Sequence, residues 1–275
     1  MTARRAAAGW TLASLLVVAW ALGPVLWVAS LSLRQGDDLA GGRFWPRAWS
    51  LEGYRAVFQT PLFTRALWNS VGVSLLSTAL SVALATLAAY AIVRLEFPGK
   101  RLVLGGALAI AMFPVVALVG PLFDLWRTLG LYDTWAGLVL PYLSFTLPLS
   151  LWVLTATFRE LPWELEEAAQ LDGATPWQAF RLVSVPLAAP GVFTAAILTF
   201  LFAWNDFAFG IALTSTDRAR TVPAALAFFT GASQFQEPAV AISAAAVVVT
   251  VPVIALVLAF QRRIVAGLTS GAVKG

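Results

Sequence analysis

The side chains that could do chemistry are few, and many of them gather in one segment. The sequence has 275 residues with no cysteine and no histidine, which removes thiolate nucleophiles, disulfides and the usual zinc, haem and general-base groups. Five carboxylates lie together between Arg159 and Arg181, in RELPWELEEAAQLDGATPWQAFR. The sequence also lacks the G-x-x-x-x-G-K-[ST] phosphate-binding loop. The chemistry left to this chain is therefore binding, through carboxylates and neutral hydrogen-bonding groups.

The carboxylate-rich segment predicts a helix, a turn and a second helix. Pro162 followed by WELEEAAQL is typical of a short helix with acids in its first turn, where the helix dipole favours them. Asp172-Gly173 predicts its end, because glycine takes the left-handed cap conformation without penalty. Trp177–Leu182 predicts a second helical stretch that runs to Pro186. Acids at one end and small alanines at the other suit docking on another protein, and an ordinary capped interfacial helix is the alternative.

Neutral polar side chains are spread through hydrophobic segments that contain no internal Asp, Glu, Lys or Arg. Ion-coupled carriers generally keep ionisable groups in the membrane, so this pattern favours a neutral, hydroxyl-rich solute. The alternative is that these groups bond within their own helix or support helix packing. The candidates for a substrate pathway are Asn69, Tyr90, Tyr142, Ser144 and Asn205.

The composition shows that lipid is the solvent for much of this chain. Hydrophobic residues make up 60% and charged residues 12%, with a mean hydropathy of +0.82, whereas a soluble domain has about 25% charged residues. This balance excludes a soluble enzyme and a disordered tail, and a net charge of +4 is too small for a nucleic-acid binder. We predict an all-α integral membrane protein with a single domain, residues 1–275.

Charge-free hydrophobic runs long enough to span a bilayer, about 20 residues, predict six transmembrane helices. Prolines inside the runs predict kinks, which helical membrane proteins tolerate. The predicted spans are about 9–33, 67–93, 102–123, 134–158, 183–205 and 239–261.

Three segments leave an alternative open. The first run follows Arg4 and Arg5 and could be a cleaved signal peptide, but the apolar region of a signal is only about 7–15 residues long. We therefore expect a retained helix. Residues 207–216 and 221–236 are uncharged but short, which favours interfacial or re-entrant pieces over a seventh and an eighth span.

Six spans place both termini on the same side of the membrane. Lysine and arginine are denser in the short loops on that side, so the positive-inside rule places both ends in the cytoplasm. The loop 159–186 and the tail 262–275 are then cytoplasmic as well.

The loop carries a signature that identifies a family. Glu167-Ala168-Ala169, then Gly173, then Val183-x-Val185-Pro186 closely resembles the EAA signature of binding-protein-dependent ABC importers, E-A-A, three residues, G, nine residues, I-x-L-P. Valine replaces both isoleucine and leucine, which keeps the apolar character.

Other stretches resemble the maltose-type sugar permeases over the full length: Tyr54–Phe58, Asn69-Ser70, Tyr90-Ala91 with Arg94–Lys100, Trp204-Asn205-Asp206 and the ending AGLTSGAVKG. FPGKRL, LYDTWAGL, LDGATP, LAAPG and FQRRIVAGLTSGAVKG look most similar to the trehalose-importing branch.

The resemblance implies the type I importer permease fold and a transport subunit that is not an enzyme. The implied partners are a homologous second permease, two cytoplasmic ATPase subunits, and an extracytoplasmic sugar-binding protein or lipoprotein. This chain would hold no cofactor, since ATP and magnesium would bind in the ATPase. The implied substrate is a neutral sugar, trehalose, with maltose, another oligosaccharide or a glycerol-phosphate-type solute as alternatives, and the implied location is a bacterial inner membrane. A secondary carrier or passive channel is the rival from another class.

The resemblance also assigns residues to these partners. Coupling to the ATPase is expected from Glu166, Glu167, Ala168, Ala169, Asp172, Gly173 and Pro186. The tail residues expected along the ATPase are Gly271, Lys274 and Gly275. Contact with the sugar-binding protein is expected from Gly231, Gln234, Phe235 and Gln236.

Overall fold

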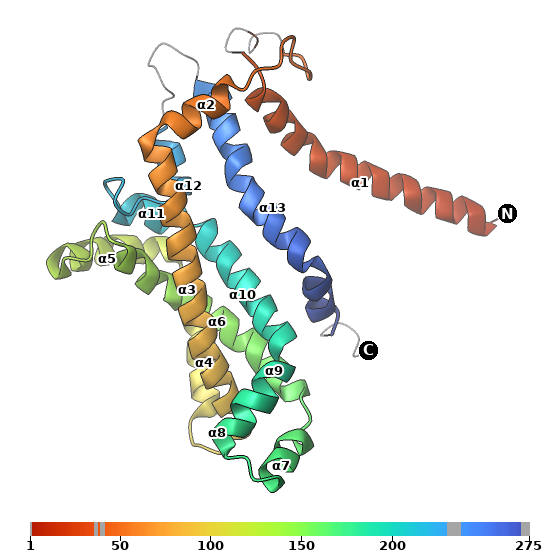
Figure 1. Ribbon diagram of the computed structural model, residues 1–275, viewed down its shortest axis with the longest axis vertical. Coiled ribbons are helices and arrows are strands. Elements are labelled where there is room, and N and C mark those ends of the chain that lie inside the picture. The colour runs from red at the N-terminus through yellow and green to blue at the C-terminus, as the bar shows by residue number, and fades with distance from the viewer. Residues whose placement is uncertain (1, 36–37, 39–41, 230–237, 271–275) are drawn as a thin grey trace. The chain divides into compact units, whose positions relative to one another are not determined.

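The computed structural model describes residues 2–35, 38, 42–229 and 238–270, which form helices and turns and contain no strand (Figure 1). Four helices are long and apolar enough to cross a membrane: α1 (Thr2–Ser32), α3 (Pro61–Arg94), α6 (Trp135–Glu160) and α13 (Pro238–Ser270). In α1 and α13 the membrane-crossing parts are Gly9–Ser32 and Ala239–Phe260.

The two other predicted spans are bent pairs of helices. Helices α4 (Lys100–Ala111) and α5 (Val115–Leu129) meet at 90°, so the span expected over 102–123, in which the sequence predicts a kink at a proline, is broken into two helices. Pro114 stands at the break with an extended ψ of 120°. The segment Pro176–Leu187 and helix α10 (Ala189–Trp204) meet at 70°, so the straight helix of the span expected from 183 begins at Ala189. Counting each bent pair as one span gives six.

The chain divides into two compact units, of which the first comprises Met1–Thr64 and Leu226–Pro252. Here helix α2 (Glu52–Gln59) packs closely against the start of α13, because a β-carbon on Gly53 would lie 2.9 Å from Val240 Cγ1. The Tyr54 hydroxyl lies 2.8 Å from Ser32 Oγ at the end of α1. Beyond α1, the buried Arg34 side chain donates hydrogen bonds to the backbone carbonyls of Arg43 and Phe44.

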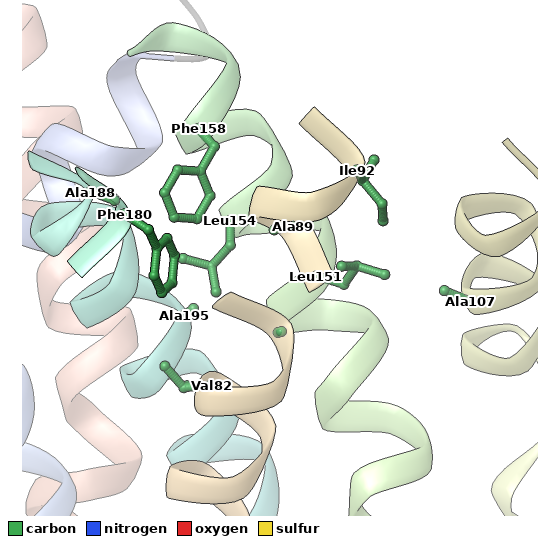
Figure 2. Close-up of a cluster of buried hydrophobic side chains, with 11 residues drawn as sticks. Val82, Ala89, Ile92, Ala107, Leu151, Leu154, Phe158, Phe180, Ala188 and Ala195 are labelled. Atoms are coloured by element: carbon green, nitrogen blue, oxygen red, sulfur yellow. The ribbon is translucent and has the colours of Figure 1, made fainter. Parts of the chain in front are cut away.

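The second unit, Arg65–Ala225 and Val253–Gly275, holds the main helix bundle. Helices α4 and α10 pack on α6, and the short α11 (Ala208–Leu213) packs on α5 and α6. Figure 2 shows side chains from α3, α6 and the α8–α10 region meeting in one apolar cluster, with Leu154, Phe158 and Phe180 near its centre.

Hydroxyl groups join the helices of this bundle. Ser81 on α3 lies 2.5 Å from Thr146 on α6, measured between the two hydroxyl oxygens. Ser150 on α6 lies 2.9 Å from Thr199 on α10. Since lipid is as apolar as the helix surfaces, such bonds and close packing of small residues hold membrane helices together. These four hydroxyl groups therefore support helix packing, which was the alternative to a role in binding solute.

Gly137 on α6 is a position where a side chain does not fit. A β-carbon there would lie 2.1 Å from the Leu131 carbonyl oxygen, which belongs to the backbone and yields little. We expect Gly137→Ala to cost about 1–3 kcal/mol, as overpacking does, and to lower the temperature at which half of the subunit aggregates in heated membrane vesicles. Gly120→Ala on α5 is the matched control, because nothing lies within 4 Å of that position. Equal midpoints for the two variants would contradict the prediction.

Candidate functional site

The loop between α6 and α10 has the predicted helix–turn–helix form. Helix α7 (Glu164–Leu171) ends before Gly173, whose φ is +93°. Helix α8 (Pro176–Ala179) starts with a capping box, in which the Gln178 side chain accepts from the Thr175 backbone at 2.8 Å and Thr175 Oγ1 accepts from the Gln178 backbone at 3.3 Å. A π-helical segment, Phe180–Ser184, and α9 (Val185–Leu187) complete the loop.

The two neighbouring glutamates of α7 point to different surroundings. Glu166 is 1% exposed; its carboxylate accepts from Arg94 Nε and from the Tyr90 hydroxyl, both at 2.9 Å. Glu167 is exposed and accepts from Trp163 Nε1 at 2.5 Å. Glu166, which the resemblance places among the residues that couple to the ATPase, therefore binds α3 through its buried carboxylate. Glu167 remains available to a partner.

The remaining signature residues lie at or near the surface of the loop. Ala168, Asp172, Gly173 and Pro186 are exposed, and Ala169 is half-buried. Sequence reasoning missed two large apolar neighbours, Leu171 at 88% exposure and Trp177 at 61%. Both were visible in the sequence as apolar residues on either side of the Asp172-Gly173 turn. Exposed apolar groups among small residues are typical of a protein-docking surface.

Asn69 on α3 is an internal connector. Its side-chain amide nitrogen donates to the carbonyl oxygens of Asp217 and Arg220 at 2.9 and 3.0 Å. Its oxygen accepts from Trp135 Nε1 at 2.9 Å. Asn69 is 6% exposed, and the next residue, Ser70, accepts a hydrogen bond from the Val222 backbone nitrogen at 2.7 Å. The Asn69 side chain therefore donates two hydrogen bonds and accepts one within the protein.

The other substrate-pathway candidates are also engaged locally. The buried Tyr142 hydroxyl donates to Asp206 Oδ2 at 2.9 Å. Ser144 and Asn205 donate to carbonyls of their own helices, those of Pro141 and Leu201. Tyr90 binds Glu166 of the loop and stands 21 positions after Asn69 on the same helix, about 30 Å away at 1.5 Å per residue. The structure does not bring the five candidates together.

A polar hollow of about 650 Å³ lies beside Asn69. Arg65 and Asp217 form an ion pair of 3.7 Å in its wall, and Trp68 contributes a ring that is 74% exposed. Asp133, which has a φ of 57°, steadies the wall by accepting from the backbone nitrogens of Ser215 and Thr216. Sequence reasoning did not find this hollow, because its residues are far apart along the chain.

Two groups of predicted site residues lie outside the described residues. They are the tail residues Gly271, Lys274 and Gly275, and the residues Gly231, Gln234, Phe235 and Gln236.

Residues 81–270 match the sequence profile of the family described as binding-protein-dependent transport system inner membrane component. The chain belongs to this family. It is 56% identical over its full length, and over the full length of the relative, to the trehalose transport system permease protein SugB of Mycobacterium tuberculosis. It is 39% identical to the trehalose/maltose permease protein MalG of Thermococcus litoralis, over 92% of each chain. It is 36% identical to the maltose/maltodextrin permease protein MalG of Escherichia coli K12, over 95% of this chain and 93% of that one.

A solved structure of a bacterial ABC transporter that imports the acidic polysaccharide alginate has the same fold. Its chain superposes with a TM-score of 0.77 at 22% identity, covering 92% of this permease and 95% of that chain. Together with the family membership, this confirms the predicted all-α ABC importer permease fold. The family consists of transport components, so the prediction of a transport subunit rather than an enzyme is confirmed too.

Proposed function

We propose that this permease subunit carries a neutral sugar, trehalose, across a bacterial inner membrane as part of an ATP-driven importer. The observation that carries the proposal is the 56% identity to a trehalose permease, over the full length of both sequences. Two further relatives are named for trehalose/maltose and maltose/maltodextrin transport. The hydrophobic segments, with no ionisable group in their interiors, agree with a neutral solute.

The importer would contain a homologous second permease, two ATPase subunits that bind ATP and magnesium, and an extracytoplasmic sugar-binding protein. Both termini and the α7–α9 loop would face the cytoplasm. The loop would meet the ATPase through Glu167, Ala168 and Gly173, which are exposed beside the apolar Leu171. Closure of the ATPase dimer on ATP would push this loop and rotate the spans, so that the cavity opens alternately to each side.

Two sequence segments complete the proposed contacts. The tail with Gly271, Lys274 and Gly275 would lie along the ATPase, where Lys274 offers a positive charge. The segment with Gly231, Gln234, Phe235 and Gln236 would meet the sugar-binding protein on the outer side.

Uptake of radiolabelled trehalose into proteoliposomes that contain the assembled importer tests the proposal. We expect uptake to fall to background when the catalytic carboxylate of the partner ATPase is replaced, with the membrane potential held constant. A secondary carrier would keep its uptake, which would overturn the ATP-driven function. Competition by unlabelled trehalose, maltose and glycerol phosphate then assigns the substrate, and stronger competition by either of the last two would overturn trehalose.

A further inference from the structure

Arg94, the last residue of α3, contacts three successive parts of the chain around the α6–α7 junction. Its Nε lies 2.9 Å from Glu166 Oε1 of α7, and the two side chains are 8% and 2% exposed. Its Nη2 donates to the Leu161 carbonyl, just after α6, at 3.0 Å. The guanidinium carbon lies 4.9 Å from the ring centroid of Trp163, within the range of a cation–π contact. One buried side chain therefore joins the end of α3 to the end of α6 and to α7.

Tyr90, one helical turn before Arg94, adds a second attachment. Its hydroxyl donates to the other carboxylate oxygen of Glu166 at 2.9 Å. Its ring centroid lies 4.6 Å from that of Phe180 in the π-helical segment and 5.9 Å from that of Phe158 at the end of α6. Figure 2 shows Phe158 and Phe180 in the same apolar cluster. Both halves of the loop are thus attached to α3.

The residue of α7 that binds α3 and a residue on the exposed surface of α7 are neighbours in the sequence. Glu166 is held by α3, while Glu167, the next residue, is exposed. A helix of eight residues is too short to be stable alone, so its position depends on what holds it. Moving Arg94 away from Glu166 would leave a buried charge without its partner, which is strongly unfavourable. The two side chains therefore stay in contact. A force applied to Glu167 therefore reaches α3 through a stiff connection.

We propose that Arg94 is a positioning residue that makes α7 and the end of α3 move as one rigid body, so that the push on the loop is passed to the membrane helix α3. The transport part of this inference rests on the proposed function, in which the ATPase pushes α7. The rigid connection itself does not.

Because this chain has no native cysteine, two cysteines introduced at chosen positions are the only spin-label sites that it contributes to the full importer. One label replaces Leu95, which follows α3 and is 53% exposed, and the other replaces Leu165, which is 44% exposed on α7. Leu165 precedes Glu167 by two positions, so it lies on a different face of the helix. We expect pulsed EPR to give one narrow distance distribution that is the same without nucleotide and with ADP trapped by vanadate after ATP hydrolysis. A distance that changes on trapping would overturn the proposal.

Arg94→Gln removes the charge and the forked contacts. We expect it to broaden the label distribution already in the nucleotide-free importer, and to lower trehalose uptake about tenfold, equivalent to 1.4 kcal/mol of lost coupling, while ATP turnover persists. Arg101→Gln, at an exposed arginine of α4, is the matched control and should change neither. Arg94→Lys should recover part of the uptake. A narrow distribution together with full uptake in Arg94→Gln would overturn the proposal.

If Arg94→Gln fails to assemble, the label distribution is measured in Arg94→Lys instead, because lysine keeps the charge but cannot reproduce the forked contacts of the guanidinium to Glu166 and Leu161. A broadened distribution supports the rigid connection, and an unchanged one overturns it. The nucleotide-free measurement also separates the two proposals. Broadening in a protein whose uptake does not depend on ATP would sustain the connection and reject only the proposed function.

Discussion

Replacing Gly173 by leucine is expected to reduce sugar uptake by about tenfold while the permease still assembles in the membrane. The φ of Gly173 is +93°, and residues with a β-carbon pay about 1–2 kcal/mol in the left-handed region. No atom lies within 4 Å of the position a β-carbon would take, so the strain comes from the backbone and not from a clash. A strained chain would relax by turning α8 relative to α7 and so displace the exposed face of the loop. A shift of 1.4 kcal/mol corresponds to a factor of ten.

Gly99→Leu is a closely matched control for this variant. Gly99 has a φ of +90° with nothing within 4 Å, but it precedes α4 instead of lying between the two loop helices. We expect Gly99→Leu to keep most of the uptake, and Gly173→Asn to be milder than Gly173→Leu because asparagine tolerates the left-handed region. Uptake and ATP turnover in proteoliposomes measure both effects. Equal losses in the two leucine variants would show that left-handed strain alone, and not its place in the loop, causes the defect.

The features that the sequence predicted correctly depend on near neighbours along the chain. Helix α7 and its end at Gly173 follow from capping and turn preferences within a few residues, and the second helix begins at Pro176, one residue before the predicted Trp177. The membrane-crossing helices follow from runs of apolar residues, since a span of about 20 such residues needs little tertiary information. The family followed from the spacing of residues 167–186, which is likewise local.

The features that the sequence missed depend on distant partners. A proline at 114 predicts a kink, but the 90° between α4 and α5 is not contained in that residue. The sequence does not show which of the neighbouring Glu166 and Glu167 is buried, and the burial of Glu166 is explained by Arg94, 72 residues earlier. The polar hollow likewise combines residues of α3 with residues near 217.

The same reasoning explains why the polar residues of the spans were ambiguous. A serine in an apolar run satisfies its hydroxyl by its own helix, by a neighbouring helix or by a solute, and the run alone does not distinguish these. In the structure Ser144 bonds its own helix, and Ser150 meets Thr199 of another. Because hydrocarbon offers no hydrogen bonds, internal partners are the default for such groups.

Asn69→Asp is expected to reduce strongly the amount of folded permease, although it changes one side-chain group and almost no volume. The amide nitrogen of Asn69 donates to two backbone carbonyls at 2.9 and 3.0 Å, and a carboxylate oxygen in its place can donate to neither and repels both. Each buried carbonyl left without its donor costs about 1–3 kcal/mol.

Asn205→Asp is the control for this second prediction, because Asn205 is an exposed asparagine that donates to its own helix. Folded protein is measured as the fraction of subunit that survives heating in membrane vesicles, and uptake is measured over a range of trehalose concentrations. If Asn69 connects α3 to the Asp217–Arg220 segment, the variant lowers the folded fraction, and the surviving importers keep the KM of the unmodified protein. If Asn69 instead binds sugar, the folded fraction is unchanged and KM rises. These opposite results decide between a structural and a substrate-binding role, and the three internal hydrogen bonds favour the structural one.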